Sequence, residues 1–232
     1  MIGLLRSAAT RALDVALPAV CVGCGAEGPP LCRTCASALD ARLDTPGGVP
    51  IGLPGDVPEP LLQLEWCAAF RGTVRAALHA IKYGGEQRMA EPLGAAIARR
   101  WRRVGVGADL VVHVPVHAAR SRTRGYDQAE RIARVAAREL GLPHRSLLTR
   151  ERATIAQFDL DRETRATNVE GAFAVLPMPG ARPGAPPVSL RDRWVLLVDD
   201  VVTTGATLAA CAVALEQAGA LAVSAITVAR ER

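Results

Sequence analysis

The chain has 232 residues and a mass of 24.4 kDa; half of its residues are hydrophobic and only 3% are aromatic. This size allows one domain with an aliphatic core and a small attached module, and no apolar run approaches the length of a membrane-spanning helix. The net charge of +5 fits a phosphate-rich ligand or a nucleic-acid partner, but it does not distinguish between them.

The first 20 residues predict a short amphipathic helix that docks on the protein. Arg6, Arg11 and Asp14 interrupt the apolar run well short of the core of a secretory signal. We therefore expect a cytoplasmic protein that does not insert into a membrane.

The stretch CVGCGAEGPPLCRTC contains two Cys-x2-Cys pairs, formed by Cys21, Cys24, Cys32 and Cys35. Two such turns can direct four thiolates toward one tetrahedral zinc ion. Disulfides and a redox pair are the alternatives, but a cytoplasmic chain disfavours disulfides and a redox pair does not need two copies. Since four thiolates leave no open coordination position, we expect a structural zinc ion.

Proline and glycine are frequent in residues 41–60, which show no periodicity and predict a linker or an irregular ordered loop. We therefore divide the chain into an N-terminal helix and zinc module (1–45), a linker (46–62) and a main domain (63–232).

In the main domain, predicted strands alternate with predicted helices. Strands are expected at 64–70, 109–116, 195–198 and 221–229, and helices at 73–82, 89–103, 126–140 and 206–219. Because the strands are continuous apolar runs, this α/β pattern predicts a mostly parallel sheet with helices on both faces. Such sheets bind ligands at the carboxyl ends of their strands, where the strand order reverses.

The stretch VLLVDDVVTTGATL (195–208) places two acidic residues, Asp199 and Asp200, just past the end of a predicted buried strand. The loop that follows contains three threonines and Gly205 and leads into a helix, whose first N–H groups suit a phosphate. Two carboxylates repel a phosphate, so we expect them to bind hydroxyl groups, as in a ribose 5-phosphate. The alternative is that one acid only caps the helix.

This stretch is similar to the motif that binds phosphoribosyl pyrophosphate (PRPP) in type I phosphoribosyltransferases. Together with the cysteine pairs, three more segments resemble the ComF family: IKYGG (81–85), VPVHAARSRTRGYDQAERIA (114–133) and RATIAQFDLDRETRATNVEGAF (152–173). Asp127 stands where that family usually has asparagine. The resemblance covers nearly the whole chain, and it implies a type I phosphoribosyltransferase-like fold and a link to DNA uptake in competence.

The resemblance also assigns roles to residues. Asp199 and Asp200 would anchor the ribose as catalytic residues. The PRPP loop would be formed by Val201, Val202, Thr203, Thr204, Gly205, Ala206 and Thr207. Pyrophosphate would be bound by Lys82, Val116, His117, Arg120 and Arg124, although a solvated basic loop and a surface lysine are the alternatives. A mobile flap is expected to contribute Thr154, Gln157, Arg162 and Asn168.

Two classes of function follow. The first is a phosphoribosyltransferase that binds PRPP with Mg²⁺ and transfers the phosphoribosyl group to an unidentified acceptor. The second is a non-catalytic subunit that senses PRPP or a nucleotide and works with a DNA-uptake machinery or single-stranded DNA. The run ARRWRR (98–103) could bind nucleic acid, but on a helix end it is more often a solvated face.

Overall fold

The computed structural model describes residues 19–47, 57–116, 126–150, 172–176 and 189–231. The expected N-terminal helix lies outside these residues, as do most of the expected linker and flap. Among the described residues, no helix combines the length and apolar character that crossing a membrane requires.

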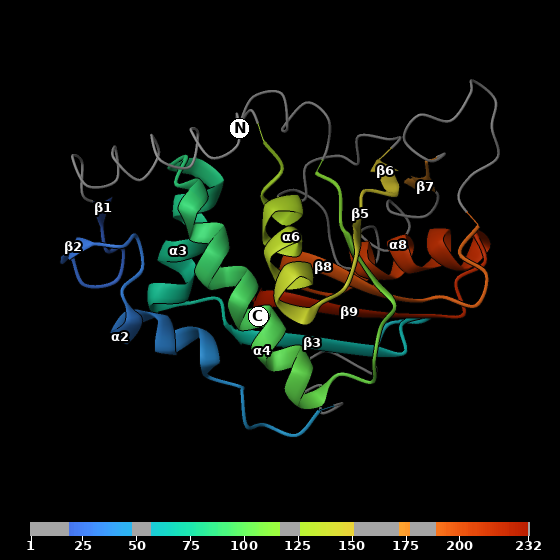
Figure 1. Cartoon of the computed structure of the whole chain (residues 1–232), viewed down its shortest axis with the longest axis horizontal. Helices are drawn as coiled ribbons and strands as arrows, with labels where there is room; N and C mark the ends of the chain where they lie inside the picture. Colours follow the sequence, from blue (N-terminus) through green and yellow to red (C-terminus); the bar gives the residue numbers. More distant parts are fainter. Residues whose placement is uncertain (1–18, 48–56, 117–125, 151–171, 177–188, 232) are drawn as a thin grey trace.

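A five-stranded, entirely parallel sheet forms the centre of the main domain (Figure 1). Its strand order is β3 (Gln63–Ala69), β9 (Ala222–Arg230), β8 (Trp194–Val202), β4 (Leu110–His113) and β5 (His144–Arg145). The strand after β4 lies on one side of it, whereas the strand after β8 lies on the opposite side. The strand order therefore reverses between β4 and β8, which is where a ligand site is expected.

Helices cover both faces of the sheet, as the sequence predicted. One buried cluster joins the sheet to α3 (Gly72–Tyr83), α4 (Ala90–Val104) and α6 (Gln128–Leu140). The other joins the opposite face to α8 (Ala206–Gln217) and to the antiparallel pair β6 (Leu148–Arg150) and β7 (Phe173–Val175). A short 3₁₀ turn, η2 (Gln87–Met89), precedes α4.

Close packing fixes α4 against α6. A Cβ atom at Gly94 would lie 2.5 Å from the Cβ of Val135, so only glycine allows this approach. Asp127 caps α6 by accepting a hydrogen bond from the N–H of Glu130 at 3.1 Å, and Gly141 ends the helix with φ = 73°. The position of α6 is thus set at both ends by local chemistry.

The N-terminal module consists of β1 (Ala19–Val20) paired with β2 (Glu27–Gly28), then α2 (Arg33–Ala36) and the 3₁₀ turn η1 (Ser37–Asp40). Leu31 and Leu39 belong to the same buried cluster as Leu78 and Ile81 of α3. The module therefore shares its core with the helix layer of the main domain. Our division of the chain at residues 45 and 62 stays a prediction.

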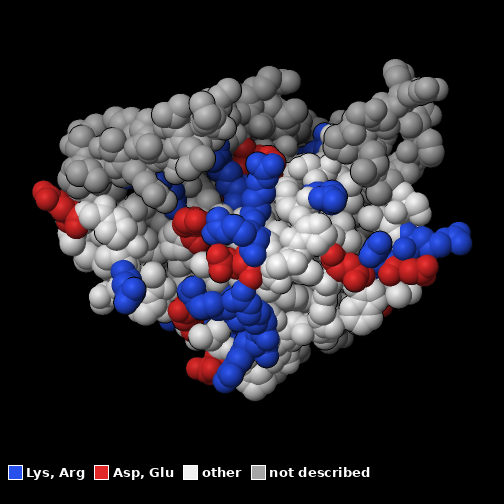
Figure 2. Space-filling view, viewed as in Figure 1, with Lys and Arg blue, Asp and Glu red and all other residues white. Residues whose placement is uncertain are grey.

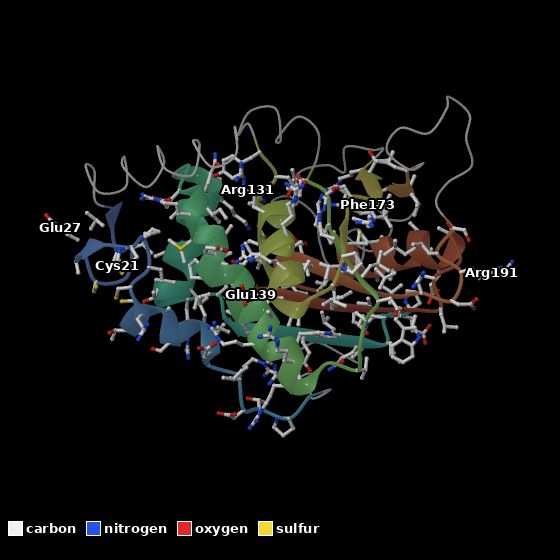
Figure 3. All side chains as sticks on the ribbon, in the orientation of Figure 1. Cys21, Glu27, Arg131, Glu139, Phe173 and Arg191 are labelled. Carbon is white, nitrogen blue, oxygen red and sulfur yellow. The ribbon has the colours of Figure 1, made fainter. Side chains whose placement is uncertain are left out.

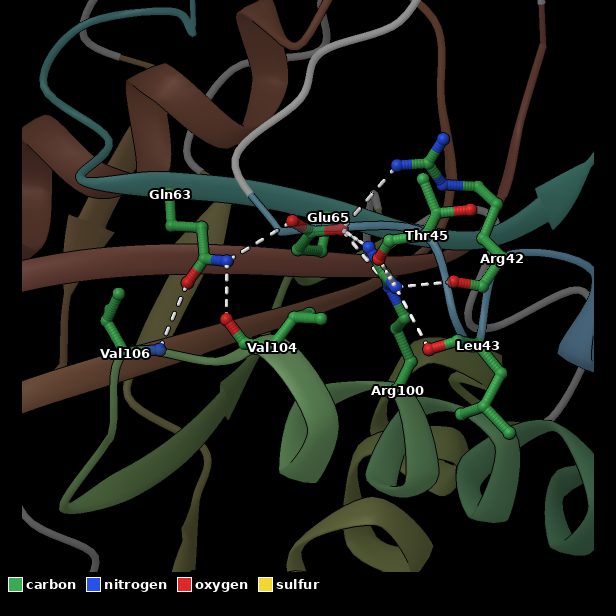
Figure 4. Close-up of polar contacts among 8 residues, drawn as sticks. All are labelled: Arg42, Leu43, Thr45, Gln63, Glu65, Arg100, Val104 and Val106. Atoms are coloured by element: carbon green, nitrogen blue, oxygen red, sulfur yellow. Dashed lines mark hydrogen bonds and ion pairs between the residues drawn. The ribbon is translucent and has the colours of Figure 1, made fainter.

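A buried ion pair ties the segment after the module to the sheet (Figure 4). Arg100 of α4 and Glu65 of β3 are each 1% exposed, and they meet at 2.6 Å. The other terminal nitrogen of Arg100 donates to the backbone carbonyls of Arg42, Leu43 and Thr45. Because Arg42 also donates its backbone N–H to the carbonyl of Cys67 at 3.1 Å, this segment lies along the outer edge of β3.

Candidate functional site

The two acidic residues lie inside a strand, not past its end as we expected. Strand β8 continues to Val202 because it stays paired with β9, through Asp199 with Thr227 and Val202 with Arg230. On its other side, β4 ends at His113, opposite Val198. The last residues of β8 therefore extend beyond β4, and successive side chains there point to opposite faces of the sheet.

Asp200 is held by two side chains from different helices. Its Oδ2 atom lies 2.9 Å from Nζ of Lys82 and accepts a hydrogen bond from Nε2 of Gln128 at 3.2 Å. Asp200 is 6% exposed, so both contacts stabilise a buried charge. Three elements, α3, α6 and β8, thus contribute the polar side chains around Asp200.

Asp199 is partly buried, and its environment disfavours the ionised carboxylate. Burial, and then the neighbouring Asp200 carboxylate, raise the pKa of Asp199 well above its ordinary value. Lys82 acts in the opposite direction and lowers the pKa of Asp199. The two carboxylates therefore influence each other, and the Lys82 ammonium partly offsets their repulsion.

The threonine loop forms the turn between β8 and α8. Gly205 has φ = 85°, and a Cβ atom there would lie 2.7 Å from Cγ of Pro58, so both backbone conformation and space require glycine. The Thr204 hydroxyl accepts a hydrogen bond from the N–H of Ala206 at 3.4 Å, at the first turn of α8. The loop and helix start thus lie where the sequence placed them.

A second loop leaves the sheet beside the acidic pair, after β4. The N–H of Val114 donates to the carbonyl of Val198 at 3.0 Å, and the N–H of Val116 donates to Oδ2 of Asp127 at 3.0 Å. Asp127 therefore fixes the start of this loop while its other oxygen caps α6. His117, Arg120 and Arg124, which we assigned to pyrophosphate, lie outside the described residues.

One pocket of about 270 Å³ contains most of the described site residues. It brings together Lys82, Val116, the acidic pair and the whole loop from Val201 to Thr207. The sequence analysis missed the other lining residues, which are Phe70, Tyr83, Val114, Pro115, Gln128, Arg150, Leu208 and Glu231. Two of them could have been predicted from the sequence. Gln128 is the first residue of α6 after its cap, and Tyr83 is adjacent to Lys82.

The root of the expected flap borders this pocket. Arg150 of β6 lines the pocket and pairs with Phe173 of β7. The two ends of the segment that we assigned to the flap are therefore neighbours. The four residues that we assigned to the flap, Thr154, Gln157, Arg162 and Asn168, lie between these positions and outside the described residues.

The four cysteines of the N-terminal module form a cluster that fits a zinc ion. Their sulfur atoms all lie within 4.8 Å of one another, and the Sγ atoms of Cys24 and Cys32 are 3.8 Å apart. Zinc–sulfur bonds of about 2.3 Å in a tetrahedron imply sulfur separations of roughly 3.8 Å. The N–H of Cys32 also points at Sγ of Cys21, at 3.3 Å. Figure 3 shows the sulfur atoms beside Cys21, at the module's end of the molecule.

Basic and acidic side chains lie side by side over the α4–α6 face (Figure 2). In the run ARRWRR, Arg99 pairs with Asp40 at 2.8 Å and Arg103 with Asp44 at 3.1 Å. Arg102 donates to the carbonyl of Glu139. With Arg100 bound to Glu65, the four arginines of this run have partners within the chain, which favours a bracing role over nucleic-acid binding.

Comparisons with known proteins identify relatives in several bacteria. The chain is 28% identical to DNA utilization protein YhgH of Salmonella typhi, over 83% of this chain and 87% of that protein. It is 30% identical to YhgH of Escherichia coli K12, over 72% and 71% of the two chains. It is 32% identical to competence protein F of Haemophilus influenzae, over 43% and 41%.

No protein-family model matches the chain. Among solved structures, a glutamine PRPP amidotransferase from B. subtilis is similar with a TM-score of 0.37 and 23% identity. That match covers 59% of this chain and 25% of the amidotransferase chain.

Proposed function

The chain belongs to the ComF family, with relatives named DNA utilization protein YhgH and competence protein F, and from its site we propose that it is a PRPP-dependent phosphoribosyltransferase. The observation that supports this proposal most is the convergence of the acidic pair, Lys82 and the threonine loop in one pocket at the carboxyl edge of the sheet.

The 5-phosphate of PRPP would bind in the threonine loop. The first N–H groups of α8 have no partners within their own helix and carry the positive end of its dipole. Thr203, Thr204 and Thr207 line the same pocket and can add hydroxyl donors. This combination of neutral donors suits a phosphate monoester.

The ribose hydroxyls would bind to the two carboxylates. Asp199 and Asp200 line the pocket directly beside the loop, so a ribose attached to the bound phosphate would reach them. Ribosyl transfer develops positive charge at C1 as pyrophosphate leaves, and nearby carboxylates stabilise such a charge. Lys82, which we expected to bind pyrophosphate, lies 2.9 Å from Asp200 and in this proposal would keep the acidic pair in position.

Pyrophosphate would bind on the β4 side, where Val116 lines the pocket and the loop with His117, Arg120 and Arg124 begins. Arginine donors form short, charge-assisted bonds to such oxygens. Mg²⁺, held mainly by PRPP oxygens, would neutralise the leaving group. The flap residues Thr154, Gln157, Arg162 and Asn168 would exclude water when the flap closes over the site.

A second function is favoured by the names of the relatives. A protein that keeps the PRPP pocket could report the PRPP or nucleotide supply to a DNA-uptake machinery without turning over a substrate. The N-terminal module shares a buried core with α3, which carries Lys82, so a partner bound to this module would be connected to the pocket.

An acceptor screen separates these functions. Purified protein with PRPP and Mg²⁺ is incubated with nucleobases, amines and single-stranded oligonucleotides, and pyrophosphate release is followed, with Asp200→Asn as control. Release that depends on Asp200 and on an acceptor supports the transferase. Thermal stabilisation by PRPP without release supports the sensing subunit, and the absence of both rejects the two proposals.

Calorimetry with three ligands tests the parts of the pocket. The double variant Asp199→Asn/Asp200→Asn should weaken PRPP and ribose 5-phosphate alike, by a few kcal/mol, because both ligands present the same hydroxyls. Arg120→Ala should weaken PRPP and pyrophosphate but leave ribose 5-phosphate almost unchanged. If Arg120→Ala weakened ribose 5-phosphate as much as PRPP, the β4 loop would not be the pyrophosphate site.

A further inference from the structure

Three consecutive residues at the beginning of α6 each contact a different part of the fold around the pocket. The Tyr126 hydroxyl donates to the carbonyl of Ile81, in the last turn of α3. Asp127, the next residue, has extended backbone angles of φ = −97° and ψ = 115°, whereas Gln128 is the first residue of the helix. Because the backbone changes conformation at Asp127, the side chains on either side of it reach different elements. We call residues 126–128 the α6 start.

Asp127 uses its two carboxylate oxygens for two separate contacts. Oδ1 accepts the N–H of Glu130 at 3.1 Å and caps α6, while Oδ2 accepts the N–H of Val116 at 3.0 Å. Val116 lines the pocket in the loop after β4. A serine also caps helices well, but its single short hydroxyl cannot make the second contact at the same time. Asp127 thus connects the helix cap to the backbone of the loop that would bind pyrophosphate.

Gln128 contacts the acidic pair. It is 4% exposed, and its Nε2 atom donates to Oδ2 of Asp200 at 3.2 Å, the oxygen that also lies 2.9 Å from Nζ of Lys82. Both contacts therefore use the same oxygen of Asp200. Within the part of the chain that the structure describes, Oδ1 of Asp200 has no hydrogen-bond partner and can accept a ligand hydroxyl.

The α6 start belongs to a firmly packed helix. Ala129, Ile132 and Ala133, which follow it directly, are fully buried, and α6 contacts both β4 and β8. Side chains placed by such an element keep their geometry better than side chains on loops. The β4 loop and the acidic pair are therefore positioned relative to one common element.

We propose that the α6 start is a positioning segment, in which Asp127 holds the β4 loop in the conformation that binds pyrophosphate and Gln128 holds Asp200 in the orientation that binds the ribose. This inference rests on the proposed function. Ribose and pyrophosphate are two parts of one ligand, so their two subsites must be aligned with each other. A misplacement of about 1 Å can cost about 100-fold in rate. Neither side chain needs to contact the reacting atoms.

Two ligands separate the roles of Asp127 and Gln128. Pyrophosphate with Mg²⁺ and ribose 5-phosphate are titrated by calorimetry into the wild type, Asp127→Ser and Gln128→Met, and the melting temperature of each protein is measured. Asp127→Ser should keep the cap and a melting temperature close to that of the wild type. It should weaken pyrophosphate binding about 10-fold, as expected when one hydrogen bond to a charged group is lost, and leave ribose 5-phosphate unchanged. Gln128→Met keeps the length of the side chain without its donor, and it should weaken ribose 5-phosphate about 10-fold and leave pyrophosphate unchanged.

Asp109→Ala is the matched control, since Asp109 also accepts a backbone N–H, that of Trp194 at 2.8 Å, at the other end of β8. Both of its affinities should equal those of the wild type. Unchanged affinities in Asp127→Ser and Gln128→Met, equal losses of both ligands, or tighter pyrophosphate binding in Asp127→Ser would each overturn the positioning role alone. If the wild type did not bind both ligands, the proposed function would fail and the positioning role with it.

Discussion

Lys82 and Asp200 form an ion pair at 2.9 Å that joins the end of helix α3 to strand β8, across 118 positions of sequence. Lys82 is the one lysine of the chain, against 27 arginines. A compact ammonium group concentrates its charge on one carboxylate oxygen, whereas a guanidinium spreads it over a planar fork. The pair therefore gives a physical reason for a lysine at this position.

Replacing Lys82 should shift the pH dependence of ligand binding. Lys82→Met removes a cation that lowers the pKa of Asp199, so this pKa should rise further. In the proposed site, Asp199 would accept hydrogen bonds from ribose hydroxyls fully only when it is ionised. The affinity for ribose 5-phosphate, measured by calorimetry from pH 5 to 9, should thus reach half its maximum at a higher pH than in the wild type.

Arg75→Met provides the matched control, because it removes an exposed cation from the same helix. Its binding curve should coincide with that of the wild type. A Lys82→Met curve with an unchanged midpoint would show that Lys82 does not control the acidic pair.

The cysteine cluster should hold about one zinc ion per chain and stabilise α3. Cys21→Ser/Cys24→Ser should lose the metal, lower the melting temperature and weaken ribose 5-phosphate binding, because the module shares its core with the helix that carries Lys82. Metal analysis, thermal unfolding and calorimetry measure the three effects. Cys211→Ala, outside the cluster, should keep its zinc; equal zinc in both proteins would refute the site.

Breaking the buried pair of Arg100 and Glu65 should destabilise the fold. Arg100→Met leaves a carboxylate that is 1% exposed without its closest cation, which costs about 3–5 kcal/mol in such sites. Adding Glu65→Met should recover part of this loss. Urea unfolding measures both changes.

The exposed pair of Arg103 and Asp44 serves as the comparison, with side chains 63% and 80% exposed. Arg103→Ala should cost only about 0–1 kcal/mol. Similar costs for Arg100→Met and Arg103→Ala would mean that the buried pair does not hold the segment after the four-cysteine module.

Two stacked histidines should make stability depend on pH. His113 and His144 approach within 3.2 Å through their ring nitrogens, and burial and then His113 lower the pKa of His144 from 6.5 to about 4. Between about pH 4 and pH 6.5, His144 is therefore protonated in the unfolded chain but neutral in the folded protein. The contribution of His144 to the free energy of unfolding is therefore fully present above about pH 6.5 and is lost as the pH falls toward 4.

His144→Gln should remove part of this loss, about 1–2 kcal/mol once solvent screening of a partly exposed ring is included. Urea unfolding at pH 7 and pH 4.5 gives the difference. His79→Gln, at an exposed histidine, should keep the wild-type pH dependence. An unchanged pH dependence in His144→Gln would exclude the pair as its source.

Local patterns in the sequence determined most of the elements of this protein. The apolar runs predicted strands β3 and β9, and helical periodicity predicted α3, α4 and α6, because each pattern reports the burial of one strand or one helix face. The alanine-rich run before Gly219 predicted α8. The spacing of the four cysteines predicted their cluster, because two short turns and a short spacer leave the chain few conformations that keep the sulfur atoms apart. The acidic pair and the threonine loop were also recognisable as consecutive residues.

The tertiary structure alone decided which distant residues meet. That β8 runs on through Asp199 and Asp200 depends on pairing with β9, and that Asp200 contacts Lys82 and Gln128 depends on how α3 and α6 pack. Strand β5 has two residues, too few for any period, and it exists because β4 offers it an edge. Periodicity records only whether a side chain is buried, whereas the identity of its partner is set by the packing of elements far apart in the chain.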